Sequence, residues 1–345
     1  MRPWIFGLNL ALKSQRYQND LADRLGKTKF MTEIPDHRIG KQAPWQRLGG
    51  AFTMGLRSCT EADWLPFEDA FGNAARRRDQ LTQTNRLLDT KHNAVFAAME
   101  SSTDACQEVL EMVTAHLARF HPREAGHSHR EAGHSHREAG LWPEPVSGVG
   151  TLALETAARM VPEDLLLLAP RTRSTDDPLL DWVLVGAALA FPAHWVLAEK
   201  MGRPLAGIHQ PVPHYDERLE APMDRFFTKM QIGPISQRWN WSLVTTDKLF
   251  TPHRTERQPL PEHAGINNIF LRMERQTLRK LPVSGHVLFT IRSYTVPVSA
   301  WEKIPGALED LVQILAEMSL PMRAYKGVEL YEAALNGYLA SRASS

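Results

Sequence analysis

Residues 268–296 read Asn268-Ile-Phe-Leu-Arg-Met-Glu-Arg-Gln-Thr-Leu-Arg-Lys-Leu-Pro-Val-Ser-Gly-His-Val-Leu-Phe-Thr-Ile-Arg-Ser-Tyr-Thr-Val296. Polar and apolar side chains alternate over 268–277 and again over 286–296, with the period of two that is typical of a strand. Between these two runs, Leu281-Pro-Val-Ser-Gly285 contains the proline and glycine that are typical of a turn. The segment therefore predicts an antiparallel hairpin, with one face of its first strand formed by Arg272, Glu274 and Gln276.

A third strand and several helices are predicted around this hairpin. Residues 236–245 have strand character, and residues 63–119 have the spacing of two or three amphipathic helices. The chain ends in two further predicted helices, at about 306–318 and 328–340. Helices before and after an antiparallel sheet indicate an α+β fold. The apolar run at 181–191 fits either a buried helix or a core strand, because periodicity does not separate the two.

The composition fits a globular protein and argues against two classes of partner. The chain has 345 residues, 43% of them hydrophobic, which is enough to bury a core of one large domain or two ordinary ones. Lysine and arginine together number 40 and aspartate and glutamate 39, so no overall positive field favours a nucleic acid or an anionic membrane. We expect neither partner.

The apolar segments and the cysteines bear on localisation and metal chemistry. No apolar stretch is long enough for a transmembrane helix. The N-terminus matches a signal peptide poorly, since Asn9 interrupts its apolar run, and we expect a cytoplasmic protein. Cys59 and Cys106 are the only two cysteines, fewer thiolates than an iron–sulfur cluster usually needs, so we expect no such cluster on this chain.

Composition divides the chain into four segments. We expect an N-terminal extension at residues 1–43, a mainly helical region packed on the core at 44–122, a His-rich repeat loop at 123–140, and the core with its C-terminal helices at 141–345. The repeat contains Arg-Glu-Ala-Gly-His-Ser-His twice, which allows either a metal-binding tract or a tandem duplication in a surface loop. We favour the loop, because the repeat has no apolar residue larger than alanine to anchor it.

A series of short motifs gives the sequence a resemblance to a known family. The most informative are Phe191-Pro-Ala-His-Trp195, Glu199-Lys-Met-Gly-Arg203 and Ile208-His-Gln-Pro-Val-Pro213. Others follow the same order along the chain: Met54-Gly-Leu56 with Asp63-Trp64, Val161-Pro-Glu-Asp164, Arg238-Trp-Asn-Trp241, Arg272-Met-Glu-Arg-Gln-Thr-Leu278, Leu281-Pro282, Phe289-Thr-Ile-Arg292 and Tyr325-Lys-Gly327. In this order they resemble the haem-dependent oxidative N-demethylase α subunit family. Each motif is weak alone, and their order is what makes the resemblance specific.

The resemblance implies a fold and an activity. For the fold it implies a PAS-like antiparallel sheet with flanking helices and a haem-binding core at 141–345. For the activity it implies oxidation of a small secondary amine such as dimethylamine, with O2 and electrons from NADPH. In this family the α subunit holds haem b, while FMN, a [2Fe–2S] cluster and tetrahydrofolate belong to the larger complex. This division suits a chain without a Gly-rich dinucleotide fingerprint, and the implied partners are reductase subunits that carry the flavin and the cluster.

The resemblance also directs attention to residues that would hold the haem. Histidine is the usual axial ligand of haem iron. His209 is the first candidate, since it lies in the best-matching motif and precedes a Pro-Val-Pro segment that limits backbone freedom, and His194 is the second. The haem propionates need cationic partners. Matched or adjacent motifs supply four cationic candidates for these contacts: Lys200, Arg203, Arg225 and Arg238. Trp195 is a candidate for the apolar wall of the haem pocket.

The expected substrate, a protonated amine, needs a hydrogen-bond acceptor or a carboxylate. Candidate acceptors are Glu163, Asp164 and Glu274, while Arg292 and Tyr294 are candidates to polarise oxygen or relay protons. Glu274 would alternatively form a salt bridge within the sheet. Three other functions stay open: a haem PAS-type gas or redox sensor without turnover, the same chemistry on a different alkylamine, and a haem-free partner protein. No kinase motif, helix-turn-helix or long coiled coil follows the core, which disfavours the sensor.

Overall fold

The computed structural model describes residues 43–48, 55–68, 74–122, 150–173, 180–215, 219–254 and 257–344. Two predicted segments concern residues outside these ranges. The N-terminal extension at 1–43 lies outside them except for its last residue, and the His-rich loop at 123–140 lies wholly outside them.

One antiparallel sheet organises the described residues. Its seven strands follow the order β1-β5-β6-β7-β3-β4-β2, and every neighbouring pair is antiparallel. The strands are β1 (Arg57–Cys59), β2 (Phe96–Ala98), β3 (Asp164–Thr172), β4 (Leu180–Ala188), β5 (Ile235–Val244), β6 (Phe270–Lys280) and β7 (Val287–Pro297). Together with the helices before and after it, the sheet confirms the α+β fold predicted from the sequence.

The predicted hairpin is formed by β6 and β7. The two strands pair along their full length, from Phe270 opposite Pro297 to Lys280 opposite Val287. In the turn, Gly285 has a φ of 69°, a left-handed conformation that glycine adopts without steric cost. The third predicted strand is confirmed as β5, which pairs with β6 over all of its residues.

The apolar run at 181–191 forms a strand, β4, and not a helix. β4 lies inside the sheet, between β3 and β2, and its residues from Trp182 to Ala188 are all buried. Because both faces of an interior strand are covered, apolar residues occupy consecutive positions and no period of two remains in the sequence.

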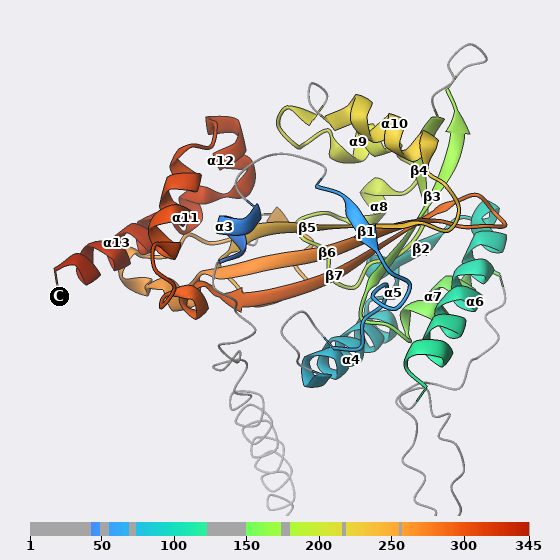
Figure 1. Cartoon of the computed structure of the whole chain (residues 1–345), viewed down its shortest axis with the longest axis horizontal. Helices are drawn as coiled ribbons and strands as arrows, with labels where there is room; N and C mark the ends of the chain where they lie inside the picture. Colours follow the sequence, from blue (N-terminus) through green and yellow to red (C-terminus); the bar gives the residue numbers. More distant parts are fainter. Residues whose placement is uncertain are drawn as a thin grey trace, which may run out of the picture.

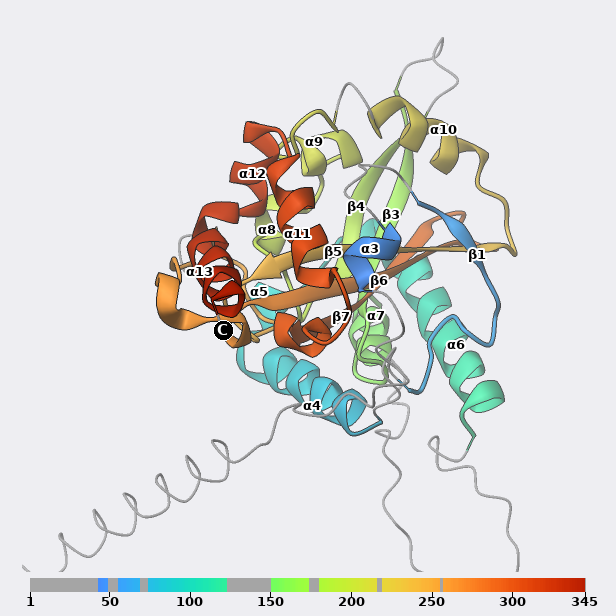
Figure 2. The same ribbon diagram turned by 60° about the vertical axis from the view of Figure 1, so that its left-hand side comes forward.

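Helices cover both faces of the sheet, as Figures 1 and 2 show. One face carries α8 (Leu197–Lys200), α9 (Leu205–His209) and α10 (Ala221–Lys229). The opposite face carries α4 (Ala74–Thr90), α5 (His92–Val95), α6 (Thr103–Phe120) and α7 (Leu152–Ala158). The sheet is thus the middle layer, and each of its faces has its own core.

Strand alternation divides the apolar residues between these two cores. Leu165 and Leu167 of β3 pack in the core that contains α6 and α7. Leu166 and Leu168 point the other way and pack with Leu205 of α9 and Phe227 of α10.

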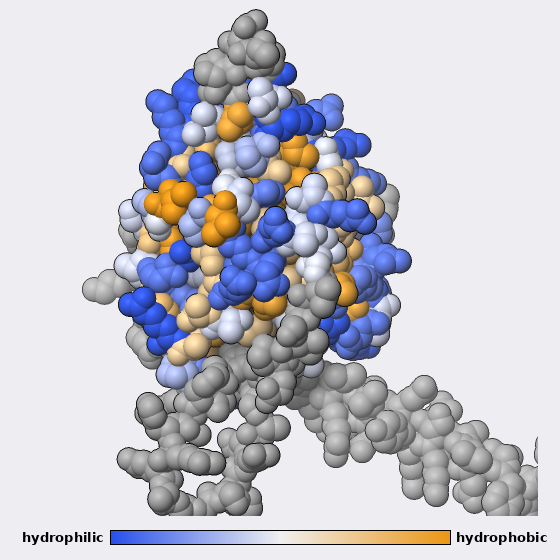
Figure 3. Space-filling view, turned by 90° about the vertical axis from the view of Figure 1, so that its right-hand side faces the viewer, coloured by the Kyte–Doolittle hydropathy of each residue, from blue (hydrophilic) through white to orange (hydrophobic). Residues whose placement is uncertain are grey.

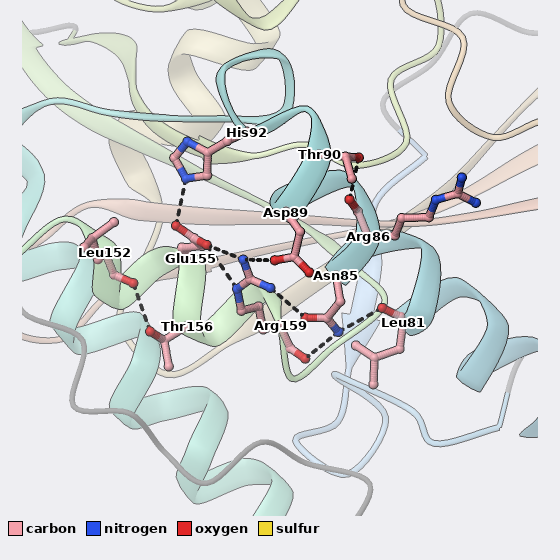
Figure 4. A network of polar contacts seen from close by, with 10 residues as sticks. All are labelled: Leu81, Asn85, Arg86, Asp89, Thr90, His92, Leu152, Glu155, Thr156 and Arg159. Atoms are coloured by element: carbon pink, nitrogen blue, oxygen red, sulfur yellow. Dashed lines mark hydrogen bonds and ion pairs between the residues drawn. The ribbon is translucent and has the colours of Figure 1, made fainter.

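Polar contacts join the helices beneath the sheet (Figure 4). Arg159, directly after α7, donates to Glu155 at 2.7 Å and to Asn85 of α4 at 3.2 Å. The same guanidinium lies 2.9 Å from Asp89 of α4, and Glu155 also contacts His92 of α5 at 2.8 Å. One carboxylate and one guanidinium thus connect three helices.

A third core lies where the C-terminal helices pack on the end of the sheet. These helices are α11 (Ala307–Ala316), α12 (Leu320–Lys326) and α13 (Glu332–Ala343). Trp45 of α3 (Pro44–Leu48) packs edge-on against Trp301 with 5.3 Å between ring centroids, and its Nε1 donates to the carbonyl of Ala307 at 2.7 Å. In Figure 2, α12 lies above the sheet on the same side as α9 and α10.

The exposed surface has a mixed character. On the face shown in Figure 3, apolar residues are scattered among hydrophilic ones. Isolated apolar side chains of this kind are normal on soluble surfaces. Within the described ranges, no helix has the length and apolar character needed to cross a bilayer.

Candidate functional site

A large cavity lies on the face of the sheet covered by α8, α9 and α10. Its volume is about 720 Å³, within the range of pockets that hold cofactors and other small molecules. Its lining comes from many separate parts of the chain, from Leu56 to Leu330, and joins Lys326 of α12 to Lys200 of α8 and His209 of α9. The cavity therefore depends on the complete tertiary fold.

The wall formed by β3, β4 and α10 is apolar. Leu166 and Leu168 of β3 line it, together with Leu184 of β4 and Phe227 of α10. Ile291 of β7 continues this wall along the sheet. Such a wall excludes water and suits a guest with a large apolar surface.

His209, the last residue of α9, lies in the cavity lining with one ring nitrogen fixed. Its Nδ1 is 2.9 Å from the carbonyl oxygen of Leu205, one turn earlier in the helix, which makes Nδ1 the protonated nitrogen. The ring stacks on Tyr215 with 5.0 Å between centroids and 9° between planes. Burial lowers the pKa of His209, so the ring is neutral at pH 7. Nε2 therefore carries a lone pair, as a metal ligand must.

The cavity contains a surplus of positive charge. Its lining includes six cationic side chains, and none forms an ion pair with a carboxylate of the described residues: Lys200, Arg238, Lys248, Arg254, Arg257 and Lys326. Burial lowers the pKa of Arg238, and its Nε is buried without a described hydrogen-bond partner. Burial likewise lowers the pKa of Lys326, to about 8. An anionic guest would stabilise these groups.

Glu274 of β6 is the one acid among the lining residues. Cross-strand pairing places Asn240 of β5 beside it, and their side chains are 3.4 Å apart. Gln276 donates to the same carboxylate oxygen, Oε2, at 2.9 Å. The other oxygen, Oε1, forms an ion pair with Arg272 Nε at 3.7 Å, which is the salt bridge within the sheet that the sequence allowed as the alternative. Because this distance is beyond hydrogen-bond range, Oε1 can still accept a hydrogen bond from a donor in the cavity.

Two buried side chains fix the loop segments that border the cavity. Asp164 Oδ1 accepts hydrogen bonds from the backbone N–H groups of Ala190 and Phe191 at 2.6 and 3.1 Å. Arg272 donates to the carbonyl oxygens of Phe191 at 2.6 Å and Leu249 at 2.9 Å. These contacts hold the segment that contains Phe191 against the segment that contains Leu249.

His194 lies in the first of these segments and lines the cavity. Its φ of 61° is unusual for a residue with a side chain, and its backbone N–H donates to the carbonyl of Thr251 at 2.7 Å. Burial, together with the charges of Arg257 and Arg254, lowers its pKa to about 4. His194 is therefore also neutral at pH 7.

Asp164 should give the stability of the protein a distinct pH dependence. Burial raises its pKa to about 7, despite the two N–H donors and Arg272. The folded state thus binds this proton more tightly than the unfolded state, so this contribution is complete below pH ~4 and is lost as the pH rises towards 7. Asp164→Asn keeps the acceptor and removes the titration, so its free energy of unfolding should fall less over that interval, by about 3 kcal/mol.

Urea unfolding of both proteins at several pH values measures this difference. Exposed Asp247→Asn serves as the control and should keep the wild-type slope. Equal slopes for wild type and Asp164→Asn would show that Asp164 does not titrate in this interval.

Three of the predicted catalytic residues lie across the sheet from the cavity. Arg292 donates to Glu163 at 3.2 Å, and both side chains are buried. Tyr294 is buried as well and stacks on Trp239 with 5.9 Å between centroids. None of the three lines the cavity. The reason is strand alternation. Ile291 faces the cavity, and because side chains alternate along a strand, Arg292 and Tyr294 both point to the opposite face of the sheet.

The residues predicted to bind the cofactor also divide into those that line the cavity and those that do not. Lys200, Arg238 and Trp195 line the cavity. Arg203 and Arg225 are exposed and lie outside its lining, in positions where water already solvates their charge.

The structure adds four side chains that the sequence did not single out. Tyr215 stacks on His209, and Arg254, Arg257 and Lys326 bring charge to the cavity from distant segments. For Lys326 the sequence did offer a signal, the motif Tyr325-Lys-Gly327. The two arginines have no comparable motif, and only the tertiary fold places them.

Fold and site together define an α+β protein with an apolar, cation-rich cavity and a neutral histidine that presents one lone pair. Residues 55–336 match the family described as haem-dependent oxidative N-demethylase, alpha subunit-like, and the chain belongs to that family. The match includes all seven strands and every element that contributes to the cavity. The resemblance that the sequence indicated is thus confirmed at the level of the family, and the family description states haem dependence.

The residues of the cavity fit a haem. Haem needs an apolar pocket, one oriented neutral histidine and cations for its two propionates. The cavity offers the leucine-rich wall, His209 with Nδ1 fixed by Leu205, and Arg238 with a buried Nε that lacks a described partner. Within the described ranges, no group of three or more His, Cys, Asp and Glu residues is arranged to hold a metal ion. Haem does not require such a group, because the porphyrin supplies most of the iron ligands.

Proposed function

We propose that this chain binds haem b in the cavity and oxidatively demethylates a small secondary amine such as dimethylamine. The observation that carries the proposal is His209, a neutral histidine in the cavity whose Nδ1 is fixed by Leu205 and whose Nε2 is left for a metal. Family membership supports the same reading, since haem dependence and oxidative N-demethylation are both in the family description.

The residues of the cavity divide the work of binding. His209 Nε2 would bind the haem iron, and the hydrogen bond to Leu205 together with the stacked Tyr215 keeps its ring in one orientation. Lys200 and Arg238 would hold the propionates. The apolar wall keeps water away from the reacting centre, which strengthens every charge interaction inside it.

Haem, when bound, supplies the iron centre for the activation of O2. The overall reaction is dimethylamine + O2 + NADPH + H⁺ → methylamine + formaldehyde + H2O + NADP⁺. The electrons come from a separate NADPH-dependent reductase, whose subunits carry FMN and a [2Fe–2S] cluster, with tetrahydrofolate as a further cofactor of the complex. The designation as an alpha subunit supports a complex of several chains, and Cys59 and Cys106 are too few for a cluster here.

Glu274 binds the amine. A secondary amine enters largely protonated, so its cavity must offer an acceptor. Glu274 Oε1 accepts one N–H of the substrate, while Gln276 and Asn240 hold Oε2 and thereby orient the carboxylate. The carboxylate can then accept the proton that the amine must lose before its lone pair can react.

Glu274→Gln should lower amine turnover by about 100-fold with haem content unchanged, because a neutral amide neither balances the ammonium charge nor takes its proton. Turnover is measured as formaldehyde release with an artificial or native electron donor, and haem content from the Soret absorption band. Glu309→Gln, at an exposed position of α11, is the control and should behave as wild type. Unchanged turnover and haem content in Glu274→Gln would remove Glu274 from the mechanism.

The function itself is tested on protein expressed with adequate haem supply. We expect a Soret band in the oxidised and reduced states and amine-dependent formation of formaldehyde when electrons and O2 are supplied. A Soret band without turnover of any small alkylamine would favour a gas or redox sensor. Absence of haem from the wild type would overturn the proposal.

A further inference from the structure

Lys326 is a lysine of the cavity with an unusual set of neighbours. It is the last residue of α12, and Gly327 follows in the left-handed conformation, with a φ of 67°. Its Nζ donates to the carbonyl oxygen of Trp241 at 2.9 Å, and lies 5.7 Å from the Trp241 ring centroid. This contact holds the side chain towards β5 and along the cavity wall.

No carboxylate of the described residues forms an ion pair with this lysine. Glu274 is close enough to favour its charged form, while Arg238 acts against it, and burial is the largest influence. The result is a pKa of about 8, so roughly a tenth of Lys326 is neutral at pH 7. For an ordinary lysine, the neutral fraction is on the order of 100-fold smaller.

We propose that Lys326 captures the aldehyde product of the cavity as an imine. The inference rests on the proposed function, which releases formaldehyde in this cavity. The neutral amine attacks the carbonyl carbon, a C–N bond forms, and the carbonyl oxygen takes a proton to give the carbinolamine. Loss of water then gives the imine Lys–N=CH2, so that one amine and one aldehyde yield one imine and one water. No oxidant or reductant is needed, and hydrolysis reverses the step.

The geometry suits this chemistry in two respects. A neutral amine that donates one N–H to the carbonyl of Trp241 keeps its lone pair for the aldehyde. Glu274, on the same cavity surface, is placed to return the proton that the loss of water requires. Buried lysines with a lowered pKa are the ones that form Schiff bases in proteins.

Reductive trapping tests the proposal on the full-length protein. Formaldehyde and sodium cyanoborohydride are added in limited amounts at about pH 7, and N-methyl-lysine is located by peptide mass spectrometry. Lys326 should be labelled at least ~10-fold faster than exposed Lys303. Its labelling rate should level off above about pH 8, while that of exposed lysines continues to rise towards about pH 10.

Two variants complete the experiment. Lys326→Met should lose the fast-labelled peptide, and Lys303→Met should keep it. Labelling of Lys326 at or below the rate of Lys303, with the surface lysines labelled, overturns the capture. Because the aldehyde is added from outside, the two failures are distinguishable. Amine turnover with an unreactive Lys326 rejects the capture alone. A reactive Lys326 without amine turnover rejects the N-demethylase, and with it the capture of its product, while the reactivity of Lys326 towards aldehydes stands.

Discussion

Replacing His209 by alanine is expected to abolish the Soret band of the wild-type protein. His209 is the lining histidine whose Nδ1 is fixed by a backbone carbonyl, so its loss removes the oriented ligand of the proposed haem site. Loss of a hydrogen-bonded partner behind a metal ligand already costs about 10–100-fold in affinity, and loss of the ligand itself should cost at least as much. Haem titration monitored by absorbance measures this affinity in wild type and variant.

His194→Ala is the matched control for that experiment. His194 also lines the cavity and is also neutral, and its Nδ1 is buried without a described partner. Haem affinity should stay within a few-fold of wild type in His194→Ala, and added imidazole should restore a histidine-like spectrum to His209→Gly. The opposite pattern, with the Soret band kept in His209→Ala and lost in His194→Ala, would make His194 the ligand.

The hairpin of β6 and β7 was predictable because one face of each strand is more polar than the other. Alternation is then visible in the sequence, and Leu281-Pro-Val-Ser-Gly285 supplies the turn. β4 was not predictable as a strand, because neighbours on both sides and cores on both faces bury its side chains from Trp182 to Ala188. β6 and β7 are also interior and largely buried, but they keep polar residues at alternate positions, whereas β4 is almost entirely apolar. Local pattern therefore predicts a strand where polar and apolar residues alternate and fails where the strand is uniformly apolar.

The same limit applies to the site. The sequence showed that Glu274 and Gln276 share one face of a strand, but it did not show which face of the sheet carries the cavity. The cavity lies on the face opposite Arg292, so Arg292 pairs with Glu163 on the other side of the sheet and does not reach the cavity. His209, which lines the cavity, was singled out through its motif, a local feature.

Electrostatics links the cavity to its supporting loops. Arg272 is buried, its Nε forms an ion pair with Glu274 at 3.7 Å, and the charges of Glu274 and Asp164 both favour its charged form. Through its two other nitrogens it holds both loop segments that border the cavity. A single side chain thus connects β6, which carries Glu274, to the loop segment that carries Phe191 and His194.

Arg272→Met is therefore expected to destabilise the protein by about 3–5 kcal/mol. The change leaves the carbonyl groups of Phe191 and Leu249 without the Arg272 donor and removes the positive charge that favours ionised Asp164. Each unsatisfied buried polar group costs about 1–3 kcal/mol, and methionine fills the volume without satisfying any of them. The free energy of unfolding in urea, compared with wild type at the same pH, measures the loss.

Arg171→Met provides the contrast. Arg171 also forms an ion pair, with Asp181 at 2.8 Å, but its side chain is 53% exposed, so water replaces the partner when the pair is broken. Its removal should change the free energy of unfolding by less than about 1 kcal/mol. Arg272→Lys should fall between the two, because one ammonium group cannot reproduce the planar fork that reaches two carbonyls in different directions. If Arg272→Met were no more destabilising than Arg171→Met, the contacts with Phe191 and Leu249 would not be what holds the cavity wall in place.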